Sequence, residues 1–135
     1  MARAASQSFR SLVAVFLFAS ACASANVTAQ TQPFSTNLFL GHWTGTWLDT
    51  GTQATGEVDL NVTRIIDDIF ALSVKLTNSS YPNWTVDGEV KGETLIVHKS
   101  TLHMEFNLHP NRNRMSVTFF NSPNQSRGTW DLRKK

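Results

Sequence analysis

Short runs of the chain alternate strictly between apolar and polar residues. One run, 57–63, places Val58, Leu60 and Val62 on the same face. The pattern recurs in three later runs: 69–76, 102–109 and 115–119. Period-two alternation is typical of β-strands with one buried and one wet face, and an α-helix does not produce it. The pattern therefore predicts antiparallel sheet and no helix after the leader described below.

Turn-forming residues interrupt the chain at seven places between Leu40 and the C-terminus. The interruptions fall at 49–51, 67–68, 78–80, 91–93, 100–101, 110–113 and 121–124. Seven turns separate eight strands, and short sequential turns favour hairpin after hairpin. We predict an all-β domain that forms an antiparallel up-and-down eight-stranded barrel. A β-sandwich is the alternative, but closure of a barrel removes the exposed edges of the sheet.

The first 25 residues have the three zones of a secretory signal peptide. Arg3 and Arg10 supply the positive charge, and residues 12–19 form an apolar stretch too short to span a bilayer. Small residues suited to cleavage occupy 23–25, with a second candidate at 27–29. We predict a secreted or periplasmic protein. Its segments are a cleaved signal peptide (1–25), a polar tether (26–38) and the barrel domain (39–135).

Removal of this leader changes the charge and the cysteine content. The chain has 12 Lys and Arg against 10 Asp and Glu, so loss of Arg3 and Arg10 leaves 10 against 10. Cys22, the one cysteine, leaves with the leader unless it is lipidated, an alternative that the sequence leaves open. A neutral mature chain gives no indication of a nucleic-acid partner, and its stability must come from core packing without a disulfide.

The two ends of the predicted domain carry related motifs. Gly41 and Trp43 open the first strand, and Trp130 and Arg133 lie in the last. A Gly-x-Trp opening strand, a closing Arg and the meander together resemble the lipocalin/avidin (calycin) superfamily. The resemblance implies that these four residues are structural, with Arg133 or Arg127 covering the Trp. Packing alone is the alternative explanation, since Gly permits close approach and Trp fills a barrel end.

Aromatic residues near a barrel mouth are the candidate ligand contacts. Trp84, Tyr81 and Trp47 can stack on a bound molecule, although aromatic residues in this position also cap cores. An eight-stranded barrel is only just wide enough for its own side chains. Because the inward residues are bulky, we expect any cavity to be small and near one end.

Catalytic and metal-binding patterns are absent from the sequence. There is no Gly-x-Ser-x-Gly, phosphate loop or His-Glu-x-x-His, and Asp67-Asp68 is interpreted as a turn. His103 and His109 are about 20 Å apart along a strand, and His98 with His103 would need a third ligand. We predict no enzymatic activity, no metal site and no cofactor.

Two functional hypotheses remain from the sequence. The first is an exported binding module for a small apolar molecule or a protein partner. The second is a solid structural or inhibitor-like exported protein with no cavity. Neither requires a nucleic-acid partner or an integral membrane span. The sequence names neither the ligand nor the oligomeric state, and it does not settle the host.

Overall fold

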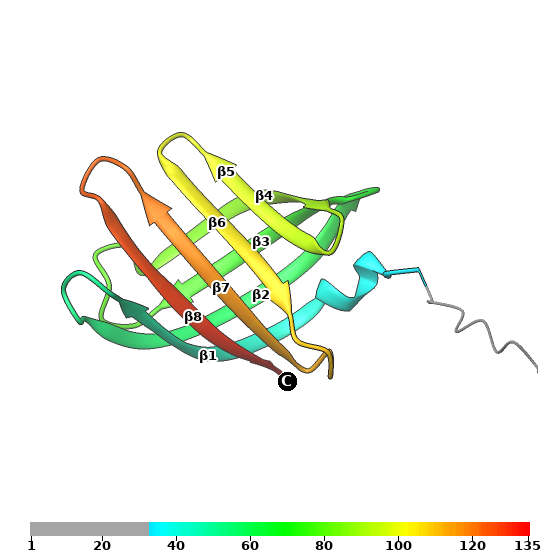
Figure 1. Ribbon diagram of the computed structural model, residues 1–135, viewed down its shortest axis with the longest axis horizontal. Coiled ribbons are helices and arrows are strands. Elements are labelled where there is room, and N and C mark those ends of the chain that lie inside the picture. Colours follow the sequence, from blue (N-terminus) through cyan, green and yellow to red (C-terminus); the bar gives the residue numbers. More distant parts are fainter. Residues whose placement is uncertain (1–32) are drawn as a thin grey trace, which may run out of the picture. The chain divides into compact units, whose positions relative to one another are not determined.

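A closed antiparallel barrel of eight strands makes up most of the described chain (Figure 1). The computed structural model describes residues 33–135, so the predicted signal peptide and residues 26–32 of the tether lie outside the described residues. The strands are β1 (Gly41–Asp49), β2 (Thr55–Ile66), β3 (Ile69–Leu76), β4 (Asn83–Lys91), β5 (Thr94–Lys99), β6 (Leu102–Leu108), β7 (Arg114–Asn121) and β8 (Ser126–Lys134). A short 3-10 helix, η1 (Thr36–Phe39), precedes β1 and was not expected from the sequence. No helix within residues 33–135 is long and apolar enough to cross a membrane.

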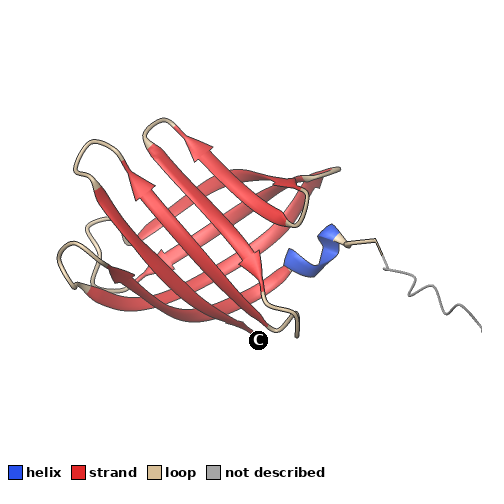
Figure 2. Ribbon diagram, viewed as in Figure 1, coloured by secondary structure: helices blue, strands red, loops and turns tan. Residues whose placement is uncertain are grey.

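Each strand pairs with its neighbour along the chain, and β1 also pairs with β8. In that closing ladder Trp47 lies directly opposite Trp130. The hairpins fall at the seven predicted interruptions, and short loops connect the strands at both ends of the barrel (Figure 2). The up-and-down barrel is therefore confirmed, and the sandwich alternative is wrong.

The predicted alternation assigns the faces of the strands correctly. Val58, Leu60 and Val62 are all buried, with exposed or half-buried residues between them. Phe70 and Phe106 are fully buried in the same core. The core thus consists of the inward positions of the strands, as expected for a barrel whose outer face meets water.

Residues before β1 seal one end of the barrel, which we call the closed end. Phe39 is fully buried, and Phe34 packs edge-on against it with ring centroids 5.9 Å apart. Trp43 is also fully buried, and its indole Nε1 donates a hydrogen bond of 2.9 Å to the Phe39 carbonyl. Lys134 Nζ donates to the Leu38 carbonyl at 3.2 Å. Part of the predicted tether therefore packs on the barrel.

A lysine takes the place that the sequence analysis gave to an arginine. Lys134 Nζ lies 5.2 Å from the centre of the Trp43 ring, so the predicted cover by Arg133 or Arg127 is wrong. Arg133 is exposed because it is one residue from the inward Lys134, and neighbouring side chains of a strand point to opposite faces. Arg127 instead lies over the outward Phe120 ring, at 5.5 Å.

Two glycines of β1 have a steric role. Gly41 has a φ of +116°, a conformation that residues with a side chain rarely adopt. At Gly45 an added Cβ would collide with the backbone carbonyl oxygen of Asp131 on β8. The backbone conformation at Gly41 therefore favours glycine, and Gly45 is what lets the closing strands approach.

Candidate functional site

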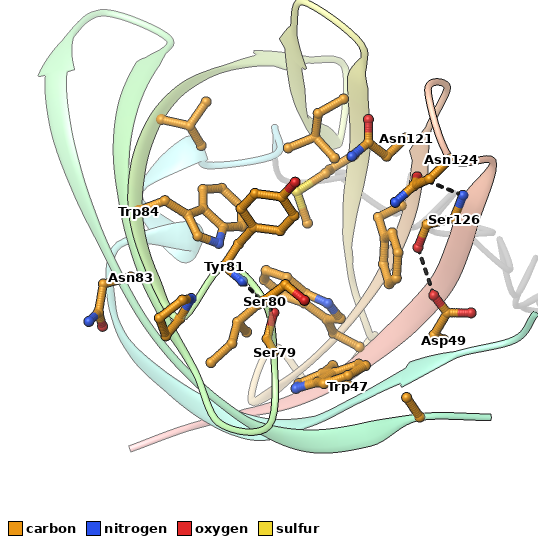
Figure 3. A pocket seen from close by; sticks show the side chains of 18 of the residues that line it. Trp47, Asp49, Ser79, Ser80, Tyr81, Asn83, Trp84, Asn121, Asn124 and Ser126 are labelled. Carbon is orange, nitrogen blue, oxygen red and sulfur yellow. Dashed lines mark hydrogen bonds between the residues drawn. The ribbon is translucent and has the colours of Figure 1, made fainter. Parts of the chain in front are cut away.

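An open pocket of about 760 Å³ occupies the end of the barrel opposite η1 (Figure 3). The β1–β2, β3–β4, β5–β6 and β7–β8 hairpins form its rim, which we call the mouth. Its position near one end agrees with the prediction, but the expected small size is wrong. Leu102 and Phe119 are two of the bulky inward residues, but they line the pocket and are only partly buried. The volume lies within the range of about 300–1,000 Å³ that is usual for small-molecule sites.

Three tryptophans form the largest aromatic surfaces of the pocket wall. Trp47 and Trp130 are inward residues of adjacent strands and are 8% and 4% exposed. Trp84 packs against Trp130 with ring centroids 6.2 Å apart and a tilt of 57°. Beneath them, Phe106 meets Trp130 edge to face at 6.0 Å. The rings of Trp84, Trp130 and Phe106 thus support one another.

The β3–β4 loop is tied down at its base and exposed at its tip. Trp47 Nε1 donates a hydrogen bond to the Thr77 carbonyl at 2.9 Å, and Asn78 Nδ2 donates to the Thr55 carbonyl at 2.8 Å. Tyr81, near the tip, is 67% exposed and reaches over the pocket in Figure 3. The loop therefore places an aromatic ring at the entrance while its base fixes Trp47.

The rim of the pocket is polar, with amide and hydroxyl side chains from all four mouth hairpins. Asp49 is the acidic group among them. Its carboxylate accepts hydrogen bonds from Ser126 Oγ at 2.7 Å and from the backbone N–H groups of Gly51 and Thr52 at 2.8 and 2.9 Å. The Ser126 bond first, and then that of Thr52, hold the pKa of Asp49 below its ordinary value. Asp49 therefore fastens two mouth hairpins together and is not a free carboxylate.

The structure brings the predicted ligand contacts together. Trp47, Tyr81 and Trp84 all line the same pocket. Trp130, predicted to be structural only, lines it as well. The predicted pairing of the first and last strands could have identified Trp130 as a pocket residue. An inward Trp directly opposite Trp47 must lie in the same surroundings as Trp47. A ligand-binding role for these residues stays a prediction.

The histidines lie away from the mouth pocket. His98 and His103 are cross-strand partners with ring centroids 5.7 Å apart, and His103 Nε2 lies 3.1 Å from Glu105 Oε1. These side chains project outward because the buried Val97 and Met104 occupy the inward positions beside them. Within residues 33–135, no three His, Cys, Asp or Glu side chains are arranged to hold a metal ion.

Comparison with known proteins gives a match for the fold but none for the sequence. No family model and no curated protein matches the sequence. The structure is similar to the crystal structure of a mutant of the fluorescent protein UnaG, with a TM-score of 0.50 and 10% identity over 75% of this chain and 99% of that chain. The two proteins share the fold of a closed antiparallel barrel. At this level of identity the likeness establishes the fold alone, so the pocket's own residues must supply the evidence for function.

Proposed function

We propose that this protein is an exported binding barrel, not an enzyme, and that it takes a small, flat, largely apolar molecule into the mouth pocket. The observation that carries the proposal is the open pocket of about 760 Å³ walled by Trp47, Trp84 and Trp130. Export is supported by the signal-peptide pattern of the first 25 residues.

The chemistry of the wall indicates the class of ligand. Indole faces favour stacked or edge-on contact with another ring system, and each such contact is worth about 0.5–1.5 kcal/mol beyond the burial of area. Leu76, Met104 and Phe119 add further apolar surface to the same pocket. Polar groups lie at the rim, so a bound molecule would place its rings inward and its polar atoms at the entrance.

A solid barrel that acts only through its outer surface is the competing hypothesis. The closed end agrees with the solid-barrel hypothesis, because the fully buried Phe39, Trp43 and Phe70 fill that part of the interior. The mouth does not fit it, because Trp84, Leu102 and Phe119 remain partly accessible there. We therefore place ligand binding at the mouth and treat the closed end as the supporting core.

A fluorescent apolar probe tests the proposal. N-phenyl-1-naphthylamine is neutral and aromatic, and its emission rises in apolar surroundings. Titration into the purified protein should show saturable binding. Trp84→Ala should weaken binding about tenfold, which corresponds to about 1.4 kcal/mol and is typical of an aromatic contact residue.

Phe120→Ala is the matched control, because Phe120 is an aromatic residue of the outer face that is 38% exposed. It should leave the dissociation constant within about twofold of the wild-type value. Absence of saturable binding by the wild type, or equal loss in the two variants, would favour the solid barrel.

A further inference from the structure

We infer that the molecule bound in the mouth pocket is an amphiphile with a negatively charged group, such as a carboxylate or sulfonate, and that Lys99 holds this group at the rim. The inference rests on the proposed function, since it gives the chemical class of the ligand for the same pocket.

Lys99 occupies an inward position at the end of β5. The alternation of this strand runs through the buried Leu95 and Val97, and Lys99 is the next residue in that phase. It lines the pocket and is exposed, so its stem follows the wall while the ammonium group can remain in water. A cation is thereby placed at the polar entrance of a pocket whose inner wall is apolar and aromatic.

No acidic side chain of the described residues, 33–135, forms an ion pair with this cation. Asp49 is the other charged residue that lines the pocket, and its carboxylate is already engaged by Ser126 and by two backbone N–H groups. Asp87, on the neighbouring β4, is an exposed outward residue and does not line the pocket. An anionic ligand would therefore meet Lys99 without displacing an internal partner.

The sheet is also interrupted beside Lys99. β4 and β5 pair at only three positions, all near their connecting hairpin, and the last of these is Glu89 with Ile96. From there to the mouth β5 keeps only β6 as a neighbour, as far as the pair of Lys99 with Leu102. Figure 1 shows β4 and β5 diverging from their hairpin.

The residues on both sides of this interruption line the pocket: Trp84, Thr85 and Val86 from β4, Lys99 from the end of β5, and Ser100 from the turn that follows. A charged group placed here would stay hydrated next to Lys99 while the apolar body of the ligand lies against Trp84. This arrangement avoids the large cost of burying a charge. The attraction between Lys99 and the charged group then favours an amphiphile over a wholly apolar molecule.

Two probes with the same ring system, one neutral and one anionic, separate the contribution of the charge to binding from that of the rings. N-phenyl-1-naphthylamine is neutral, and 8-anilinonaphthalene-1-sulfonate carries a sulfonate on the same skeleton. Lys99→Gln should weaken sulfonate binding about three- to fivefold, as for a solvent-exposed ion pair, and leave the neutral probe within about twofold. Raising the salt concentration should weaken sulfonate binding to the wild type and have less effect in the variant.

Lys91→Gln is the control with the same change in net charge. Lys91 lies at the other end of the same strand pair, with its Nζ 3.6 Å from Glu89, and should leave the binding of both probes unchanged. If the neutral probe does not bind the wild type, the proposed function itself fails. If it binds, but Lys99→Gln and Lys91→Gln affect the sulfonate equally, or Lys99→Gln weakens both probes equally, only the assignment of Lys99 is overturned.

Discussion

Single residues at the seam between β1 and β8 decide whether the barrel can close. Gly45 lies between the inward Trp43 and Trp47, and a methyl group there would run into the Asp131 carbonyl. A backbone atom cannot move aside without shifting its strand, so the effect of added volume should spread along the seam.

We expect Gly45→Ala to lower the free energy of unfolding by about 1–3 kcal/mol. Urea denaturation followed by tryptophan fluorescence measures this value. Gly51→Ala, in an exposed turn where the nearest atom belongs to the Asp49 side chain, should cost less than about 0.5 kcal/mol. Equal effects of the two changes would show that close approach at Gly45 is not required.

The ion pair between Arg114 and Asp131 should make the free energy of unfolding depend on pH. Arg114 Nε and a terminal guanidinium nitrogen donate to the two carboxylate oxygens at 2.8 and 2.6 Å, and these bonds hold the pKa of Asp131 below its ordinary value. A lowered pKa in the folded state contributes stability above the unfolded pKa of about 3.9, and this is lost as the pH falls through the folded pKa.

Asp131→Asn should therefore lower the urea midpoint at neutral pH, and the difference from the wild type should vanish at about pH 2. Asp87→Asn is the control, because Asp87 forms no ion pair within residues 33–135. The account of this pair would be wrong if the Asp131 effect persisted unchanged in acid.

At the residue scale, the face on which a side chain lies can be predicted from the sequence, but its partner on the neighbouring strand cannot. Alternation gives the inward set because the period of a strand is fixed. The partner of Trp43 depends on the register of β8, where a shift of one residue exchanges Arg133 for Lys134. Alternation alone does not fix that register, so an arginine was predicted where Lys134 lies.

At the scale of elements, the turn-forming residues account for most of what could be predicted about the order and limits of the strands. All seven hairpins lie where Asp, Asn, Gly, Ser or Pro interrupt the alternation. The helix η1 was missed because four residues are too few to show a period. The early separation of β4 from β5 was missed because pairing extent depends on tertiary geometry that local patterns do not contain.

The inward and outward faces of β6 should differ sharply in their contribution to stability. Phe106→Ala should cost about 3–5 kcal/mol through lost burial and a cavity, since the ring is fully buried against Trp130. His103→Ala on the outer face should cost under about 0.5 kcal/mol. Thermal unfolding monitored by circular dichroism compares them, and equal shifts in melting temperature would contradict the face assignment.

Closure by β8 should make the domain a single cooperative unit. Deleting residues 127–135 removes Trp130, Lys134 and the pairing partner of β1. We expect the truncated protein to unfold as a whole, which the loss of amide dispersion in NMR spectra and of a cooperative thermal transition would show. A soluble truncated protein with a near-native melting temperature would contradict this role of closure.

For the molecule as a whole, the sequence predicted the architecture and part of the pocket. Trp47, Tyr81 and Trp84 were chosen because aromatic residues suit a barrel mouth, and the structure places them in one pocket. The volume was underestimated because the bulky inward residues were taken to fill nearly all of the interior and to leave only a small cavity near one end. In the structure the fully buried Phe39, Trp43 and Phe70 lie toward the closed end.

Export is the remaining whole-molecule prediction. The mature protein should begin at Asn26 or Gln30, directly after the candidate cleavage sites. N-terminal sequencing of the protein recovered from the extracytoplasmic fraction tests this. Detection of an intact Met1 on exported protein would reject cleavage.

The central claim, that a ligand enters at the mouth and leaves the closed end unchanged, is tested most directly by the four indole N–H resonances in NMR spectra. Titration with N-phenyl-1-naphthylamine should shift the resonances of Trp47, Trp84 and Trp130. The resonance of Trp43, whose N–H is bonded to the Phe39 carbonyl at the closed end, should stay in place. A saturating probe that moves Trp43 most, or moves none of the four, would contradict the account.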